Sequence, residues 1–169
     1  MPGFIHQFNI AWMREPFDSE LFDDFRERLS ELHDLADNSA GFVWRHDGTQ
    51  EKNGYIQPYS SLPLVMGNYS IWSDYDSLFY YTFSGGHMDL MRDRKKWFEP
   101  AAGRTYSVLW VEDSLSDGSI DEGKMRIECL KSWGDTQQAF GFGKRGKELA
   151  RQELARREDR SDVVEDDIC

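Results

Sequence analysis

The chain has 169 residues, of which 39% are hydrophobic and 14% aromatic, and its formal net charge at pH 7 is -11. This length fits one domain with a real core, and the hydrophobic content excludes a mainly disordered chain. The negative charge repels phosphate backbones, so we expect no nucleic-acid partner. No apolar run approaches the roughly 20 residues of a bilayer span, and the N-terminus lacks the features of a secretory signal. We therefore expect no membrane partner and a cytoplasmic location.

The first half of the sequence predicts a strand, a helix and a second strand. Residues 4–11 alternate between two faces, as a half-buried strand does. Between residues 16 and 37, apolar side chains recur at three- and four-residue spacing, which is typical of a helix with one buried stripe. Residues 38–41 end this helix, and residues 42–46 predict a short strand.

The middle of the chain predicts a strand followed by two helices. Residues 64–72 predict the strand, and residues 75–83 and 87–98 predict the helices, with Ser-Gly-Gly between them. Ser73 and Asp76 resemble a capping box at the start of the first helix.

The C-terminal part predicts a fourth strand over residues 105–111 and a helix over residues 120–133 that begins at a Ser119 cap. Residues 139–142 can form a short last strand. From residue 144 onward the sequence is highly charged, so we expect an exposed helix and a frayed acidic end.

The resulting order, β-α-β-β-α-β with an added C-terminal helix and strand, is the ferredoxin-like arrangement of the α+β class. Two helices cover one face of such a sheet, and in small domains a second copy usually covers the other. The strand over residues 64–72 has large side chains on both faces, which supports burial of both. We therefore expect residues 1–143 to form a dimeric α+β barrel domain, as a homodimer, with residues 144–169 as a charged extension.

Four ordered motifs resemble a known family. They are QFNIA at residues 7–11, GFVWR at 41–45, NYSIW at 68–72, and SGGH with the helix that follows it at 84–98. This pattern is similar to that of the domain-of-unknown-function 3291 family, which is grouped with the dimeric α+β barrels beside antibiotic-biosynthesis-type monooxygenases. The resemblance covers residues 4–142 and implies the fold rather than one reaction. It departs at residues 113–118, which lack the Gly-His-Ile-Pro-like sequence usual there.

Three residues are candidates for catalysis. His87 follows Gly85-Gly86 near a helix start, where an imidazole can serve as a general acid or base, or can simply cap the helix. Asn9 and Asn68 lie in strands that this topology makes adjacent. Their amides can donate hydrogen bonds to a carbonyl or enolate oxygen, or can pair with each other and fix the strand register.

The predicted substrate-binding residues are Trp44, Arg45, Trp72, Met91, Trp97 and Trp110. The tryptophans can line a flat aromatic pocket, or can belong to the core and the dimer interface. Arg45 can meet a carboxylate or phenolate, although single arginines more often form surface ion pairs.

The four histidines have no metal-ligand spacing, and His33 lies between charged residues, where we expect exposure. Haem-binding relatives of this barrel place a histidine about one turn beyond His87, where this chain has Met91. We therefore expect no cofactor, and haem is not favoured.

The resemblance implies a small-molecule-modifying enzyme of the cofactor-independent monooxygenase type, in which the carbanion of an aromatic or polyketide-like substrate reacts with oxygen. His87 would be the base, and Asn9 and Asn68 would bind the enolate oxygen. The alternatives are a non-redox isomerase, cyclase or dehydratase, and a non-catalytic ligand-binding dimer. The two enzyme hypotheses assume a partly hollow, tryptophan-walled space over the second face of the sheet, with His87 at its mouth. The non-catalytic dimer instead predicts a pocket filled by tryptophan side chains, with no space around His87.

Overall fold

The structure is a computed structural model that describes residues 3–49, 51–100, 106–113 and 119–159. In these residues four strands form one antiparallel sheet in the order β2-β3-β1-β4. The strands are β1 (Phe4–Trp12), β2 (Phe42–Arg45), β3 (Val65–Trp72) and β4 (Ser107–Glu112). The helices are α1 (Asp23–Asp37), α2 (Tyr75–Phe83), α3 (Gly85–Asp93), α4 (Ile120–Trp133), α5 (Lys144–Glu158) and the short 3-10 turns η1 (Glu20–Phe22) and η2 (Arg94–Lys96). This order and pairing confirm the ferredoxin-like α+β fold.

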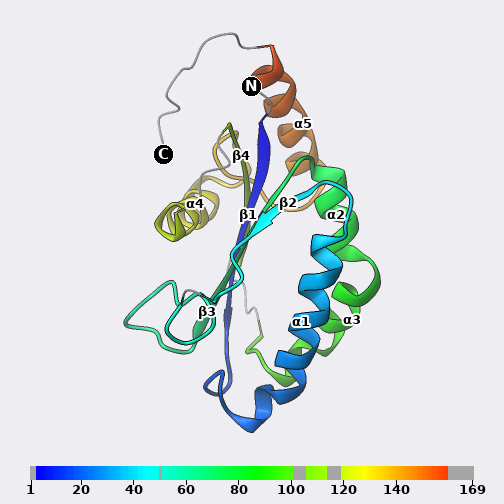
Figure 1. Ribbon diagram of the computed structural model, residues 1–169. Helices are drawn as coiled ribbons and strands as arrows, with labels where there is room; N and C mark the ends of the chain where they lie inside the picture. The colour runs from blue at the N-terminus through cyan, green and yellow to red at the C-terminus, as the bar shows by residue number, and fades with distance from the viewer. Residues whose placement is uncertain (1–2, 50, 101–105, 114–118, 160–169) are drawn as a thin grey trace.

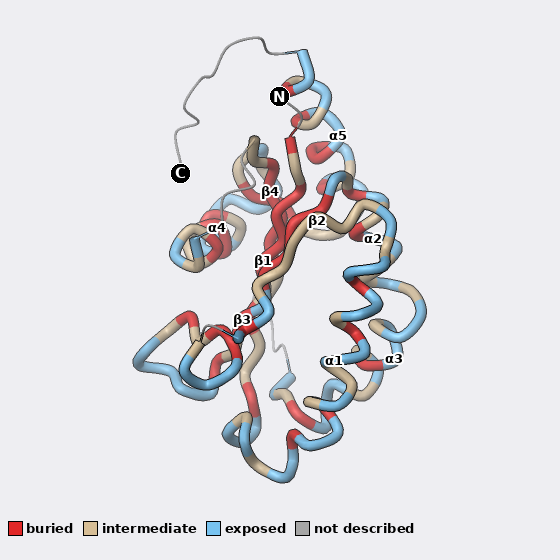
Figure 2. Tube along the Cα trace, in the orientation of Figure 1, coloured by how far each residue is buried: buried red, intermediate tan, exposed pale blue. Residues whose placement is uncertain are grey.

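The sheet has two faces, which we name after the helices that cover them. Figure 1 shows α1, α2, α3 and α5 on one side of the sheet and α4 on the other. Along β1, odd-numbered side chains point to the α1 face and even-numbered ones to the α4 face, because the side-chain direction alternates. Figure 2 shows that the strands are mostly buried and the outer helix surfaces exposed.

The α4 face is filled by the chain itself. Phe8 and Trp110 from the sheet pack with Ile127 of α4 and with Ile56, which pairs with Gly67 of β3. All four of these large side chains are buried to within 2% of complete burial. The expectation of a hollow space on this face is therefore wrong, because α4 and the segment around Ile56 occupy it. The bare face that led us to expect a second copy is absent, and the homodimer stays a prediction.

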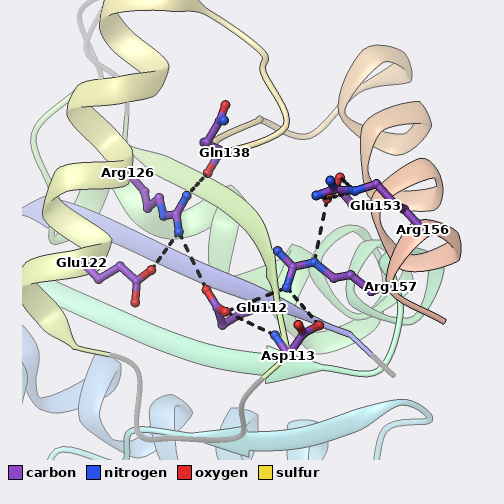
Figure 3. A network of polar contacts seen from close by, with 8 residues as sticks. All are labelled: Glu112, Asp113, Glu122, Arg126, Gln138, Glu153, Arg156 and Arg157. Atoms are coloured by element: carbon purple, nitrogen blue, oxygen red, sulfur yellow. Dashed lines mark hydrogen bonds and ion pairs between the residues drawn. The ribbon is translucent and has the colours of Figure 1, made fainter. Parts of the chain in front are cut away.

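Helix α5 is also packed, so the expectation of an exposed helix is wrong. Leu149 and Ala150 are buried in an apolar cluster with Ile5 and Trp72 at one end of the α1 face, which we call its upper end. Figure 3 shows that Arg157 reaches across to the end of β4, where its Nη1 lies 2.9 Å from Oδ1 of Asp113, the residue after the strand. Glu153, only 2% exposed, binds Arg156 on the same helix. Because most residues of α5 are charged, this narrow buried stripe left little sign in the sequence. The division of the chain at residue 143 stays a prediction.

Some local expectations are confirmed and others are corrected. Ser119 caps α4, because its Oγ accepts a hydrogen bond from the Glu122 backbone N–H. The cap of α2 is Asp74 and not Ser73, since Asp74 Oδ1 accepts from the Ser77 N–H at 2.8 Å. The segment 139–142 is not a strand, because only Phe140 pairs with β4 there, as an isolated bridge. The helix expected over residues 87–98 starts at 85 and tightens into η2 after residue 93.

We expect Gly123→Ala to destabilise the fold by about 1–3 kcal/mol through overpacking. A Cβ at position 123 would lie 2.5 Å from Cγ of Phe8, a ring held between sheet and helix. Gly86→Ala is the control, because its Cβ would make only ordinary contacts, with Leu35 Cδ2 at 3.6 Å and Leu32 Cδ2 at 4.0 Å. Urea unfolding measures both, and a Gly123→Ala variant as stable as the wild type would contradict the packing described for α4.

We expect Leu149→Ala to reduce the free energy of unfolding by about 2–5 kcal/mol, the usual cost of a large-to-small change in a core. Leu149 is 2% exposed. Glu148→Ala, on the exposed side of the same helix, should change stability by no more than about 0.5 kcal/mol. If residues 144–169 behaved as a detached extension, the two variants would unfold at the same urea concentration.

Candidate functional site

A row of polar side chains crosses the α1 face between two apolar clusters. The cluster at the upper end includes Ile5 and Trp72, and the one at the lower end includes Met13 and Trp97. The polar row lies between them and consists of Gln7, Asn9, Arg45, Asn68, Ser70 and Ser107. Polar groups within a covered sheet face are costly unless they are satisfied, so such a row calls for an explanation.

Hydrogen bonds join Ser70, Gln7 and Asn9 of this row into one chain that begins at Trp72. Trp72 Nε1 donates to Ser70 Oγ at 2.9 Å, and Ser70 Oγ donates to Gln7 Oε1 at 3.0 Å. Gln7 Nε2 in turn donates to Asn9 Oδ1 at 2.7 Å. Gln7 and Ser70 are each only 8% exposed, so this chain satisfies groups that water does not reach.

Asn68 stands directly opposite Asn9 in the β1–β3 pairing, as the sequence predicted. Although it lies within β3, Asn68 is exposed, and Asn9 is half-buried. The carbonyl oxygen of Asn9 accepts from Gln7, which leaves the Asn9 amide N–H groups pointing away from Gln7. The row therefore offers two amide donors at a place that solvent reaches.

His87 is connected to this network through two tilted ring contacts. Its ring centroid lies 5.1 Å from that of Tyr81, which lies 5.0 Å from that of Trp72. His87 Nδ1 is 2.8 Å from the Thr82 carbonyl oxygen. Because a carbonyl only accepts, Nδ1 carries the proton, and neutral His87 has its lone pair on Nε2. Burial lowers the pKa of His87, so the imidazole is neutral near pH 7 and can accept a proton.

Arg45 closes the β2 end of the row. Its Nε and Nη2 donate to the two Asp37 carboxylate oxygens at 3.0 and 3.3 Å. Its Nη1 is buried and has no partner among the described residues. Nearby, burial raises the pKa of Tyr81 to about 12. Burial, assisted by Arg45, lowers the pKa of His33, which is half-buried rather than exposed as expected.

The four predicted tryptophans do not line one space. Trp44 and Trp110 lie on the α4 face, where both pack against Tyr69. Trp72 is buried on the α1 face, and Trp97 packs against Phe25 at its lower end. Of the four, Trp72 alone hydrogen-bonds to the polar row in the described residues.

Met91 is half-buried on α3, one turn after His87.

Sequence reasoning missed Gln7, Ser70, Tyr81 and Ser107. Gln7 lies two residues before Asn9, and Ser70 lies two residues after Asn68. Side chains two residues apart on a strand point to the same face, and this spacing was the sequence signal for Gln7 and Ser70. Tyr81 belongs to the network only because α2 lays its ring on Trp72. A second buried polar pair, His6 Nδ1 and Tyr69 OH at 2.6 Å, lies on the filled α4 face.

Other possible sites carry less chemistry. Two surface hollows, of about 470 and 230 Å³, border α2 and include none of the predicted site residues. We favour the polar row because Gln7 and Ser70 are buried and hydrogen-bonded, and because Trp72 and Tyr81 connect them to a histidine. Among the described residues no three His, Cys, Asp or Glu side chains come together as metal ligands. None of the described helices has the length and apolar character of a membrane span.

The geometry defines a ferredoxin-like α+β protein with a hydrogen-bonded polar row on its helix-covered face. The chain belongs to the family described as "Domain of unknown function (DUF3291)", whose model matches residues 4–156. No curated protein matches the sequence.

Among solved structures, this chain is similar to three small proteins at low identity. A protein from Nitrosomonas europaea, provisionally assigned as an antibiotic biosynthesis monooxygenase, has 10% identity and a TM-score of 0.47, with 70% of this chain and 97% of that one covered. A conserved protein from Methanosarcina mazei has 13% identity and a TM-score of 0.45, with 64% and 90% covered. SnoaB, a cofactor-independent oxygenase from Streptomyces nogalater, has 9% identity and a TM-score of 0.43, with 69% and 100% covered.

We expect the free energy of unfolding to fall as the pH drops below about 6.5, the ordinary pKa of histidine. Folding lowers the pKa values of His87 and His33, so as the pH falls the unfolded chain takes up protons at a higher pH than the folded chain does. The stability that these histidines contribute is therefore complete above pH 6.5, and it is lost as the pH falls through their pKa values in the folded protein. Urea unfolding between pH 5 and 8 measures this slope, and His87→Gln should reduce it. Nitrogen-15 NMR of the imidazoles should show the Nδ1–H tautomer for His87, and an Nε2–H signal would contradict the assignment.

Proposed function

We propose that this protein is a small-molecule-modifying enzyme of the cofactor-independent monooxygenase type, acting on an aromatic or polyketide-like substrate. The observation that carries the proposal is the neutral His87, whose Nε2 lone pair is set by the bond from Nδ1 to the Thr82 carbonyl. A base of this kind, on the helix side of the face that holds the Asn9 and Asn68 amides, suits proton removal next to a carbonyl.

The first step is the transfer of a proton from a substrate CH₂ group to His87 Nε2. The electron pair that remains is delocalised onto the neighbouring carbonyl oxygen as an enolate. The N–H groups of Asn9 and Asn68 donate to that oxygen, because donors fixed in place stabilise charge as it develops. Gln7 holds the Asn9 amide in this orientation.

The second step uses dioxygen as the oxidant. The carbanion adds to O₂, and the peroxide anion takes the proton back from His87. Loss of water from the hydroperoxide breaks the O–O bond and leaves a new carbonyl, so CH₂ and O₂ become C=O and H₂O. The substrate carbon supplies the electrons that reduce oxygen. The apolar clusters on either side of the row supply apolar walls beside the carbanion.

We expect the protein to oxidise 9-anthrone, an acidic three-ring aryl ketone, to anthraquinone with one O₂ consumed. His87→Gln should lower the rate by about 10²–10⁴-fold, the usual contribution of a general base. Asn68→Ala should lower it by about 10²-fold, as loss of one oxyanion donor does. His46→Gln is the matched control, because His46 pairs with Glu51 beyond the end of β2 and should leave the rate unchanged. Absorbance and an oxygen electrode give both readouts.

Anaerobic incubation in D₂O separates this proposal from a non-redox isomerase, cyclase or dehydratase. Without oxygen, the proposed enzyme should exchange the CH₂ protons of anthrone but form no product. An isomerised or dehydrated product under these conditions would favour the alternative. Equal exchange rates for His87→Gln and the wild type would remove His87 from the mechanism.

A further inference from the structure

Helix α2 carries a group of exposed aromatic side chains. Phe79 and Phe83 are 43% and 41% exposed, and their ring centroids lie 4.6 Å apart. Phe142, two residues before α5, meets Phe83 edge to face at 5.2 Å. Within the part of the chain that the structure describes, nine large apolar side chains are exposed, and three of them lie on this helix of nine residues. Apolar side chains gathered at one place on a surface mark a site of interaction.

A hollow beside these rings offers a place for an apolar side chain. It has a volume of about 230 Å³ and is lined by Tyr75, Phe79, Gly143, Lys144 and Lys147. A cavity of about 150 Å³ already holds benzene, so a phenyl or leucyl side chain fits this hollow. Lysine side chains combine an apolar stem with a charged end. The hollow therefore suits a segment that brings an apolar side chain and carboxylates together.

Hydrogen bonds and ion pairs hold the two elements of this surface together. Helices α2 and α5 lie side by side (Figure 1). Tyr75 Oη accepts a hydrogen bond from the Gly143 N–H at 3.0 Å, which holds the start of α5 against α2. Asp76 of α2 contacts Lys147 Nζ at 2.6 Å and Arg151 Nη2 at 2.8 Å on α5. The surface is therefore formed before any partner arrives, and binding needs little further ordering.

This surface has a local excess of positive charge, although the chain as a whole is acidic. Asp76 contacts two cations, Lys147 and Arg151, and its single charge neutralises only one of them. Lys144 is exposed and forms no ion pair with any residue that the structure describes. Uncompensated lysines next to exposed aromatic rings favour a partner that is both apolar and negatively charged.

We propose that this surface binds a short acidic segment of another protein. The residues that form it, which we call the α2–α5 surface, are Tyr75, Phe79, Phe83, Phe142, Lys144 and Lys147. One apolar side chain of the segment enters the hollow, and a second lies on the exposed Phe79 and Phe83 rings. Asp or Glu carboxylates beside them pair with the two lysines. None of these residues belongs to the polar row, so the inference does not rest on the proposed function.

The charges argue against two other occupants. A second copy of the chain, related by a two-fold axis, would place the lysines of both copies in one interface. An anionic membrane would face a whole side of a molecule whose net charge is -11. A short peptide instead meets only the charges within about 8 Å, the screening length at physiological salt. The ion pair of Arg145 with Glu148, in the first turns of α5, adds no net charge there.

Three nonapeptide amides, each labelled with fluorescein at the N-terminus, test the chemistry of the partner. The peptide EDFEDLFDE combines acidic and apolar side chains, KKFKKLFKK reverses the charges, and EDSEDSSDE replaces the apolar side chains with serine. Fluorescence anisotropy should show the first peptide binding the wild-type protein at least about tenfold tighter than either of the others. Raising NaCl from about 50 to about 500 mM should weaken its binding at least about fivefold. Equal or tighter binding of either other peptide, or no binding of the first at about 1 mM protein, would overturn the inference.

Variants of the α2–α5 surface test its contacts. Phe79→Ala should weaken binding of the acidic, apolar peptide by about tenfold, as truncation of an aromatic anchor does. Tyr80→Ala is its control, because Tyr80 is 76% exposed on the same helix and lies outside this surface. Lys144→Glu should also weaken binding by about tenfold. Lys95→Glu makes the same change in net charge at an exposed position in η2 and should leave the affinity unchanged.

Thermal melting checks that each variant is folded, and Lys144→Glu, at an exposed position, keeps the test open if Phe79→Ala is unstable. Wild-type affinity in either folded variant would overturn the inference.

Two further measurements decide between the acidic segment and the other occupants. In sedimentation equilibrium, the wild type and Phe79→Ala should have the same mass. A dimer that dissociates in the variant would show that a second copy covers the surface and would overturn the inference. Neither protein should sediment with vesicles made of equal amounts of phosphatidylcholine and phosphatidylserine. Vesicle binding that Lys144→Glu abolishes would assign the surface to a membrane, and the inference would be wrong.

Discussion

The α1 face depends on the side-chain amide of Gln7. Its oxygen accepts from Ser70 and its nitrogen donates to Asn9, so one buried residue ties β1 to β3 and orients both neighbours. Ser70 in turn fixes the Trp72 indole, on which Tyr81 rests, and Tyr81 supports His87. An apolar residue at position 7 would leave Ser70 and the Asn9 carbonyl oxygen without these bonds. A single amide thus connects the core of the sheet to the candidate base.

The two faces of the sheet use the same strands for different purposes. On the α4 face, Phe8, Tyr69 and Trp110 are completely buried beneath α4. On the α1 face, the helices cover the two ends of the strands, and polar groups interrupt the apolar clusters between them. Polar atoms that a continuous apolar core would exclude thus lie in the middle of the α1 face.

The topology, and the placement of Asn9 and Asn68 on neighbouring strands, could be predicted from the sequence. Both follow from the spacing of apolar residues along the chain and from the order of the predicted strands and helices. The distribution of the tryptophans could not. Trp44 should share a face with Phe42, two residues earlier, but a register shift between them places Phe42 on the α1 face and Trp44 on the α4 face. The same irregularity points Arg45 toward Asp37 of α1. A bulge depends on how the strand pairs with its neighbour, so the alternation of apolar and polar residues in one sequence does not reveal it.

The break between α2 and α3 explains why a histidine can become a base here. In a continuous helix the Thr82 carbonyl would accept from the backbone N–H four residues later. Ser84 instead adopts an extended conformation and Gly85 a left-handed one, with φ of +55°, so the helix stops and the Thr82 oxygen is left for another donor. His87 Nδ1 supplies that donor, which fixes the tautomer and places the lone pair on Nε2. The Ser-Gly-Gly sequence thus determines the protonation chemistry of His87 as well as the path of the chain.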